Sequence, residues 1–297
     1  MSGAVALLGL CRLLLDGAAL LLWGMTLMLL VLVPQPLRDA LWQRLALCRR
    51  VLCTLILLAV VGTLPLQAAI LGEGWPDALR MQMLAAVANG TSIGTAWWCQ
   101  LSALVLLLAA GLFRITLAQR ASLLASAILL AGLSLTGHAA MHQGWPGLLH
   151  QANDVLHVWA VGAWVGALPV VLLVLPRLQR SAQAPETAQA VTILRRFSTA
   201  GHGVVALVWF TGLVNTCFIL GGLPLDWSFT YQRLLALKCV LVGVMVLVAL
   251  FNRYGLVPAL RRQPRALALL ARLTWLEILL SLLVMALLAW LGMLQPD

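Results

Sequence analysis

The chain has 297 residues, of which 63% are hydrophobic and only 9% are charged. A water-soluble domain carries roughly 25% charged residues, so this composition excludes a soluble globular protein and predicts an integral membrane protein. The formal net charge is +10 at pH 7, which would suit an anionic partner if the basic residues formed one cluster.

Eight segments are long and apolar enough to cross a bilayer, which takes about 20 helical residues. Leu, Ala and Val dominate them, and the short alternating strands of a transmembrane barrel do not occur. We therefore predict an all-α polytopic transmembrane bundle in a single domain, 1–297. The apolar N-terminal run is not expected to be a cleaved signal peptide, because it is long and no small-x-small site follows it. The predicted spans are 7–33, 51–71, 95–113, 121–142, 151–175, 198–220, 232–252 and 272–293.

The basic residues are unevenly shared between the connections. Fifteen lie in or beside the connections between helices 1–2, 3–4, 5–6 and 7–8, and the opposite connections offer only Arg80 and Arg233. Because cytoplasmic loops retain Lys and Arg, we expect both termini on the outer, periplasmic side. The positive charge is then a topology signal in a protein whose partner is membrane lipid, not nucleic acid. The polar segment 179–190 is predicted to be an inward loop.

Four of the five histidines lie between residues 136 and 166. His138 and His142 are four residues apart, so they are predicted to share one face of helix 4. A turn is expected at Gly144–Gly147. On helix 5, His150, Asp154 and His157 then fall within an arc of roughly 60°.

The opposite side of helix 5 carries Gly162 and Gly166, a Gly-x-x-x-Gly pair typical of close packing between membrane helices. One face of this helix is thus expected to pack, while the other presents imidazoles and a carboxylate.

Imidazole together with the thioether of Met141 is a ligand set that suits copper, Cu(I) in particular. Asp154 can ligate a metal or orient a histidine ring. The alternative is that these side chains are interfacial polar groups bonded to water and lipid headgroups, which applies most to His142 and His150 beside the turn. Ionisable groups deeper in an apolar segment usually mark a site or pathway. The candidate metal ligands are His138, Met141, His142, His150, Asp154 and His157.

Other ionisable residues lie inside the predicted spans and are candidates for a relay or pathway. Arg12, Asp16 and Lys238 can form an ion-pair network with Asp154. Glu277 is predicted at a depth similar to that of His202, where the pair is either an inward relay or a structural hydrogen bond. The six cysteines form no Cys-x-x-Cys motif and are interpreted as small buried residues. The pathway candidates are Asp16, His202, Lys238 and Glu277.

Five stretches of the second half are distinctive: SLTGHAA, NDVLHVWAVGAWVGALPVVLLVL, RRFSTAGHGVVALVWFTGLVNT, YQRLLALKCVLVGVMVLVALFNRYGLVPAL and ARLTWLEILLSLLVMALLAWLG. Over residues 134–293 the chain resembles the CopD family of integral membrane copper-resistance proteins. Lys238, Asn252-Arg253, Pro258 and Glu277 are the specific positions. The first 130 residues match as a hydrophobic pattern. Many relatives carry a histidine in helix 1, where this chain has Arg12 and Asp16.

The resemblance implies an eight-helix protein of the bacterial inner membrane that moves copper inward from a periplasmic copper-carrier protein. The leading hypothesis is a copper permease, not an enzyme. It would capture a copper ion, Cu(I) or Cu(II), at the histidine-rich turn and pass it inward near Asp154 and His157. No nucleotide-binding motif occurs, so movement is expected to be passive or coupled to protons through Asp154 or Glu277.

Two alternatives stay open. One is a haem b electron carrier in which His138 and His157 are the axial ligands. The other is a copper sensor or scaffold that docks a periplasmic carrier and moves no metal. Hydrolytic enzymes are disfavoured, since neither Gly-x-Ser-x-Gly nor His-Glu-x-x-His is present.

Overall fold

The computed structural model describes residues 2–35, 37–137, 141–179, 185–221, 227–260 and 264–291. These residues are helical with short connections, and no strand occurs among them. Eight helices are long and apolar enough to cross a membrane, which confirms the predicted all-α bundle. They are Gly3–Leu32, Ala46–Leu71, Ser92–Leu112, Ile115–Leu133, Gly144–Leu178, Pro185–Leu220, Thr230–Ala259 and Arg265–Ala289.

The first half of the chain supplies four of these spans and two short helices. A turn of 3₁₀ helix, Trp75–Leu79, precedes α4, and a second, Ala110–Leu112, extends α5. The helices are α1 (Ser2–Leu32), α2 (Leu37–Arg44), α3 (Ala46–Leu71), α4 (Met81–Gly90), α5 (Ser92–Ala109) and α6 (Ile115–Leu133).

The second half supplies the other four spans. The fifth span consists of α7, α8 and the 3₁₀ turn Leu175–Gln179, and a π-helical turn, Asn252–Leu256, joins α10 to α11. The helices are α7 (Gly144–Val165), α8 (Leu168–Val174), α9 (Pro185–Leu220), α10 (Thr230–Phe251), α11 (Val257–Ala259) and α12 (Pro264–Leu291).

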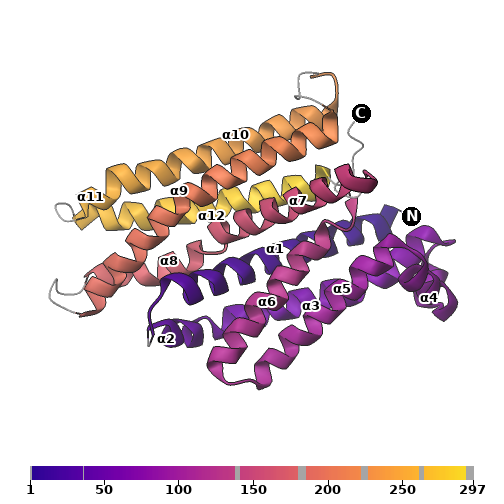
Figure 1. The fold of residues 1–297 in the computed structure, drawn as a ribbon, viewed down its shortest axis with the longest axis horizontal. Coiled ribbons are helices and arrows are strands. Elements are labelled where there is room, and N and C mark those ends of the chain that lie inside the picture. The colour runs from indigo at the N-terminus through magenta and orange to yellow at the C-terminus, as the bar shows by residue number, and fades with distance from the viewer. Residues whose placement is uncertain are drawn as a thin grey trace.

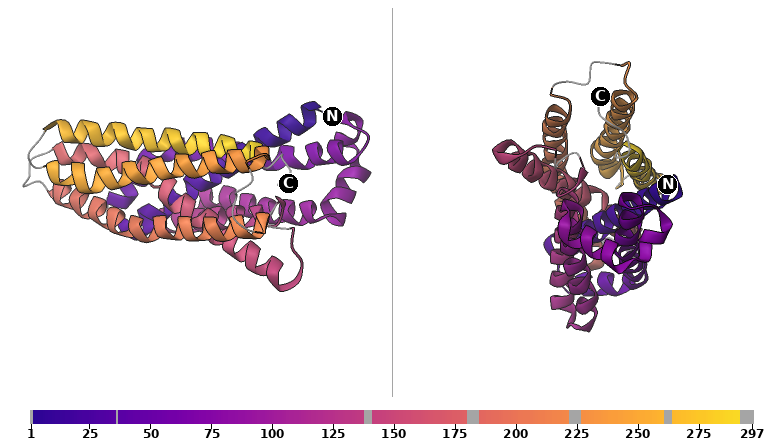
Figure 2. Two further views of the ribbon diagram at one scale, coloured as in Figure 1. Left: turned by 90° about the horizontal axis from the view of Figure 1, so that it is seen from above. Right: turned by 90° about the vertical axis from the view of Figure 1, so that its right-hand side faces the viewer.

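Helix α1 lies at the centre of the bundle, where it packs on α3, α6, α7 and α12. The second half forms two further pairs, α7 with α9 and α10 with α12. Figure 1 and Figure 2 show the long helices running side by side, with the start of α1 and the end of α12 toward the same end of the bundle. We call this the terminal end. The connections that carry most of the arginines lie at the other, which we call the arginine end.

The contact between α1 and α7 is close because glycines face each other there. A Cβ on Gly24 would lie 2.6 Å from the Cα of Gly166 and would also meet the backbone of Gly162. The packing surface predicted from the Gly-x-x-x-Gly pair is therefore confirmed, with α1 as its partner. Beside it, the indole N–H of Trp23 donates to the carbonyl oxygen of Trp159 at 2.9 Å.

The junction between the fourth and fifth spans differs from the prediction. Helix α6 ends at Leu133, nine residues before the predicted end of the span, and His142 is not helical. Gly137 has φ +74°, a left-handed conformation that favours glycine. His138 lies outside the described residues, and Met141 and His142 belong to the connection.

The turn predicted at Gly144–Gly147 is also wrong, because these residues form the first turn of α7. Pro146 is compatible with that position, since the first backbone N–H groups of a helix have no partner within it. Helix α9 likewise begins earlier than predicted, at Pro185, so residues 185–190 are helical and not a loop.

Candidate metal site and membrane pathway

A pair of histidines lies at the terminal end of α7. The Nδ1 atoms of His142 and His150 are 3.4 Å apart. The ring of Phe218, from α9, stacks on His150 with centroids 4.8 Å apart and planes 10° apart. His150 is only 1% exposed, whereas His142 is half-buried. The pair therefore joins the connection, α7 and α9 at one point.

Gly147 explains how the connection comes so close to α7. A Cβ at that position would lie 2.8 Å from the carbonyl carbon of His142. Only the absence of a side chain lets the backbone at His142 fold against the first helical turn, which places its imidazole beside that of His150.

The distance between the two imidazoles suits a shared ion. Two nitrogens bound to one metal at about 2.0–2.1 Å, with tetrahedral or trigonal angles, lie roughly 3.3–3.6 Å apart. The same distance allows one ring to donate a weak hydrogen bond to the other. Met141, next in the chain, is 55% exposed. Among the described residues, no group of three or more His, Cys, Asp or Glu side chains is arranged to hold a metal.

One turn further along α7, Asp154 is the centre of a polar network. Its Oδ2 accepts from the hydroxyl of Ser134 at 2.7 Å, and its Oδ1 accepts from Nδ2 of Asn215 at 2.9 Å. Asn153 donates to Oδ1 of Asn215 at 2.6 Å. The carboxylate is thus held between α6, α7 and α9 by neutral donors.

His157 follows on the same face of α7, and its Nδ1 lies 2.9 Å from the hydroxyl oxygen of Thr211. That hydroxyl donates to the carbonyl oxygen of Leu207 at 2.6 Å. It therefore accepts from Nδ1 of His157, which leaves Nε2 with the lone pair that a metal or proton requires.

Asp16 and Lys238 approach this network from α1 and α10. The charge of Asp16 interacts with those of Arg12 and Asp154, and that of Lys238 interacts with Asp154. The ion-pair network predicted for these residues and Asp154 has no direct salt bridge among the described side chains. In the part of the chain that the structure describes, the ion pair within 4 Å is the one between Arg80 and Asp77. The Oδ1 atom of Asp16 is buried and has no hydrogen-bond partner among those residues.

His202 and Glu277 line one cavity, of about 290 Å³, in the arginine half of the bundle. They do not bond to each other. Glu277 accepts from Nδ2 of Asn252 at 3.3 Å, while Nε2 of His202 lies 2.9 Å from the hydroxyl of Tyr254. The two residues thus share a cavity wall, as their predicted similar depth suggested. Their role as a relay stays a prediction.

An apolar cluster lies between the polar network and the cavity. Its buried members are Trp164, Val165, Met245 and Val284, and partly buried valines of α9 pack against them. On α7, the cluster members Trp164 and Val165 come after His157 in the chain. Trp164 also lines the cavity. We call it the apolar layer.

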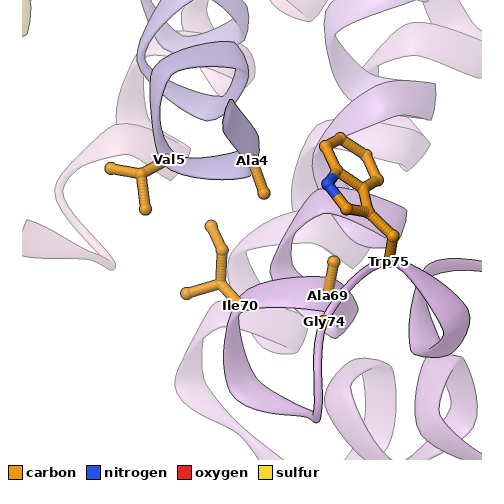
Figure 3. A pocket seen from close by; sticks show the side chains of 6 residues that line it. All are labelled: Ala4, Val5, Ala69, Ile70, Gly74 and Trp75. Atoms are coloured by element: carbon orange, nitrogen blue, oxygen red, sulfur yellow. The ribbon is translucent and has the colours of Figure 1, made fainter. Parts of the chain in front are cut away.

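A second hollow, at the terminal end, has a volume of about 10 Å³. Figure 3 shows that its lining is apolar, with Ala4 and Val5 of α1 facing Ala69 and Ile70 of α3 and the ring of Trp75. It offers no ligand group and is no larger than one water molecule.

Sequence reasoning missed the side chains of α6 and α9 that hold the α7 groups. Thr211, Asn215 and Phe218 are spaced four and three, so they share one face of α9. The two polar members of that face, set in an apolar span, were a signal that could have identified it.

Comparison with known proteins identifies the family of this chain. A family model described as the copper resistance protein D-like N-terminal domain matches residues 1–148, and one described as copper resistance protein D matches residues 191–291. Copper resistance protein D of Pseudomonas syringae pv. tomato is 34% identical over 260 residues, which cover 82% of this chain and 81% of that protein. The chain belongs to the copper resistance protein D family.

Two further relatives extend this result. Inner membrane protein YebZ of Escherichia coli K12 is 32% identical over 269 residues, 89% of this chain and 90% of that protein. Copper transport protein CutJ of Bacillus subtilis is 31% identical over 201 residues, 64% of this chain and 36% of that protein. With its eight apolar helices, this family member is a multi-pass inner-membrane protein. No solved structure matches it.

The N-terminal match corrects one expectation from the sequence. Residues 1–148 carry more than a hydrophobic pattern, because they match a family model of their own.

Proposed function

We propose that this protein is a copper permease that takes up copper at its terminal end, on the periplasmic side, and passes it inward. One observation carries the proposal: the Nδ1 atoms of His142 and His150 are 3.4 Å apart, a separation at which two imidazoles can bind one copper ion. The printed names of the relatives, copper resistance protein D and copper transport protein CutJ, support copper as the cargo.

The first step is capture. Imidazole nitrogen binds both Cu(I) and Cu(II), and the thioether of Met141 adds a soft ligand beside the pair. The exposure of Met141 and half-burial of His142 leave this side of the site open to an incoming ion or to a periplasmic copper carrier. His138, three residues before Met141, is proposed as a further ligand.

The second step is transfer along α7. Seven residues of helix separate His150 from His157, a rise of ~10 Å, with Asp154 between them. The carboxylate of Asp154 offsets the positive charge of an ion that leaves water, and Nε2 of His157 is a receiving ligand. Asp16 and Lys238 adjust the charge around this point. The apolar layer must then separate for the ion or a coupled proton to continue inward.

Elemental analysis of the purified protein tests capture. After growth with copper, we expect close to one copper per chain in the wild type. His142→Ala and His150→Ala should bind copper at least about tenfold more weakly, since even the loss of a residue that only supports a ligand costs 10–100-fold. His202→Ala, which removes a histidine from the arginine half, and Leu149→Ala, on the same turn as His150, serve as controls and should retain copper.

The metal content, together with copper uptake into sealed vesicles, distinguishes the permease from the haem b carrier and from the sensor or scaffold. Full copper in both histidine variants would contradict the proposed site. Iron near one per chain, without copper, would favour the haem b carrier. A protein that binds copper but moves none into sealed vesicles would be the sensor or scaffold.

A further inference from the structure

The cavity in the arginine half, beyond the apolar layer, has the form of a small-molecule site. It lies between the two helix pairs of the second half, α7 with α9 and α10 with α12. Its volume of about 290 Å³ is near the lower limit of known small-molecule pockets, about 300–1,000 Å³. Most of the wall is apolar and includes the aromatic rings of Trp164 and Phe197.

Hydrogen-bond acceptors gather at one side of this wall. Asn252 is 8% exposed, and its Nδ2 donates to Oε2 of Glu277. Its Oδ1 is buried and accepts from no described group. The hydroxyl of Thr274, also on the wall, donates to the carbonyl oxygen of Leu270 and therefore presents only lone pairs. A buried acceptor without a donor is unfavourable, so the site is complementary to a molecule that donates.

The lining disfavours copper. His202 is its one imidazole among the described residues, and both ring nitrogens are engaged, Nδ1 with the carbonyl oxygen of Ser198 and Nε2 with Tyr254. The remaining polar ligand atoms on the wall are oxygens, which suit hard cations better than copper.

The charges and the position of the cavity restrict the occupant further. Arg253 and Glu277 both line the wall. Each is already hydrogen-bonded to another side chain, so a neutral molecule is favoured over a charged one. Glu277 lies thirteen residues into α12, a rise of ~20 Å from its start, which is near the middle of the span. Charged lipid headgroups do not reach that depth.

Access is from the lipid. On α9, Trp209 and Phe210 are 47% and 65% exposed, and on α10 Leu247 is 67% exposed. The seam between these two helices is joined by hydrogen bonds from Arg253 to Ser198 and between His202 and Tyr254. On the side of these bonds that faces the terminal end, small and aliphatic side chains form the cavity wall. A molecule dissolved in the bilayer therefore meets an apolar entrance.

We propose that this cavity binds a neutral ring compound of the quinol class, whose phenolic hydroxyl donates to Oδ1 of Asn252. A single substituted ring fits the volume, whereas the two acyl chains of a phospholipid do not. Trp164 and Phe197 supply ring contacts. This inference is independent of copper capture, because it shares no residue with the histidine pair.

Equilibrium dialysis of the full-length protein in detergent tests the proposal with two matched probes. Trimethylhydroquinone carries the donating hydroxyls, and its 1,4-dimethyl ether has the same ring without them. Empty micelles measure partitioning. We expect saturable binding of about one hydroquinone per chain, with the ether at least about tenfold weaker because the buried acceptor is then unpaired. Equal binding of both probes, or no saturable binding, would overturn the proposal.

Two variants separate the polar contact from the space. Asn252→Leu removes the acceptor at similar size and should weaken the hydroquinone about tenfold while leaving the ether unchanged. Ala249→Phe fills the cavity and should abolish binding of both. Leu247→Ala, on the lipid side of α10, is the control and should bind as the wild type does. Undiminished binding to Ala249→Phe would refute the site, and so would a tightly held phospholipid in the cavity of the wild type. The comparison of the two probes uses the wild type alone, so it does not depend on how any variant folds.

Discussion

Among the described residues, no cationic side chain lies within 4 Å of the Asp154 carboxylate. The hydroxyl of Ser134 and the amide of Asn215 hold it in the membrane span. Neutral donors fix its position but leave its charge uncompensated at short range. A carboxylate in this state is prepared for an arriving cation, whereas one locked in a salt bridge is not.

Two substitutions at this point separate charge from hydrogen bonding. Asp154→Asn keeps the size and removes the charge, so we expect copper uptake into proteoliposomes to fall at least about tenfold while copper capture at the histidine pair persists. Ser134→Ala keeps the charge and removes one hydrogen bond, at about 1 kcal/mol of stability, and uptake should stay within about twofold. Equal uptake by Asp154→Asn and wild type would remove Asp154 from the pathway.

The sequence identified the α7 groups but not what surrounds them. His150, Asp154 and His157 follow from helical spacing alone. Their partners Ser134 and Asn215 come from other helices, and which helix faces which depends on packing that local periodicity does not encode. Predictions at His138 stay outside the described residues.

At the scale of elements, the glycine contact between α1 and α7 determines how close the central helix comes to the pathway. Gly24 lies against the backbone of Gly162 and Gly166, so α1 brings Asp16 into range of Asp154. Small residues allow such approach between membrane helices, where apolar burial gives no preference over lipid.

Gly24→Ala should therefore destabilise the protein by about 1–3 kcal/mol, because the added methyl meets backbone atoms that cannot move aside. Gly243→Ala is the matched control: nothing lies within 4 Å of a Cβ there, and the change in helix propensity should stabilise by up to about 1 kcal/mol. The thermal unfolding midpoint in detergent measures both. A midpoint that rises in the Gly24 variant would show that the contact is not tight.

The sequence predicts which segments form helices, but it does not predict where each helix begins and ends. All eight spans follow from runs of apolar residues, but α6 ends at Leu133 and α7 begins at Gly144, both before the predicted points. The residues between these helices mix apolar and polar types, so hydropathy alone does not locate either boundary. Helix α7 can begin at Gly144 because a first helical turn tolerates Pro146.

At the scale of the whole molecule, the start of α1 and the end of α12 lie toward the same end of the bundle, and most arginines belong to the connections at the opposite end. Eight crossings require the first of these facts. The second predicts that the terminal end faces the periplasm, because cytoplasmic connections retain basic residues.

Alkaline phosphatase, which is active only after export, tests this topology. Fused after Asp297 it should be active, and fused after Phe113, in the connection between α5 and α6, it should be inactive. The reverse pattern would place the histidine pair in the cytoplasm and would turn the proposed import into export.

The apolar layer has a further consequence at this scale. Trp164, Val165, Met245 and Val284 form a buried apolar contact between α7, α10 and α12 on the route proposed inward from His157. A bacterial inner membrane stores energy as a voltage, and a continuous file of water through eight helices would discharge it. An apolar layer that stays closed until an ion arrives would preserve that voltage while the protein is at rest.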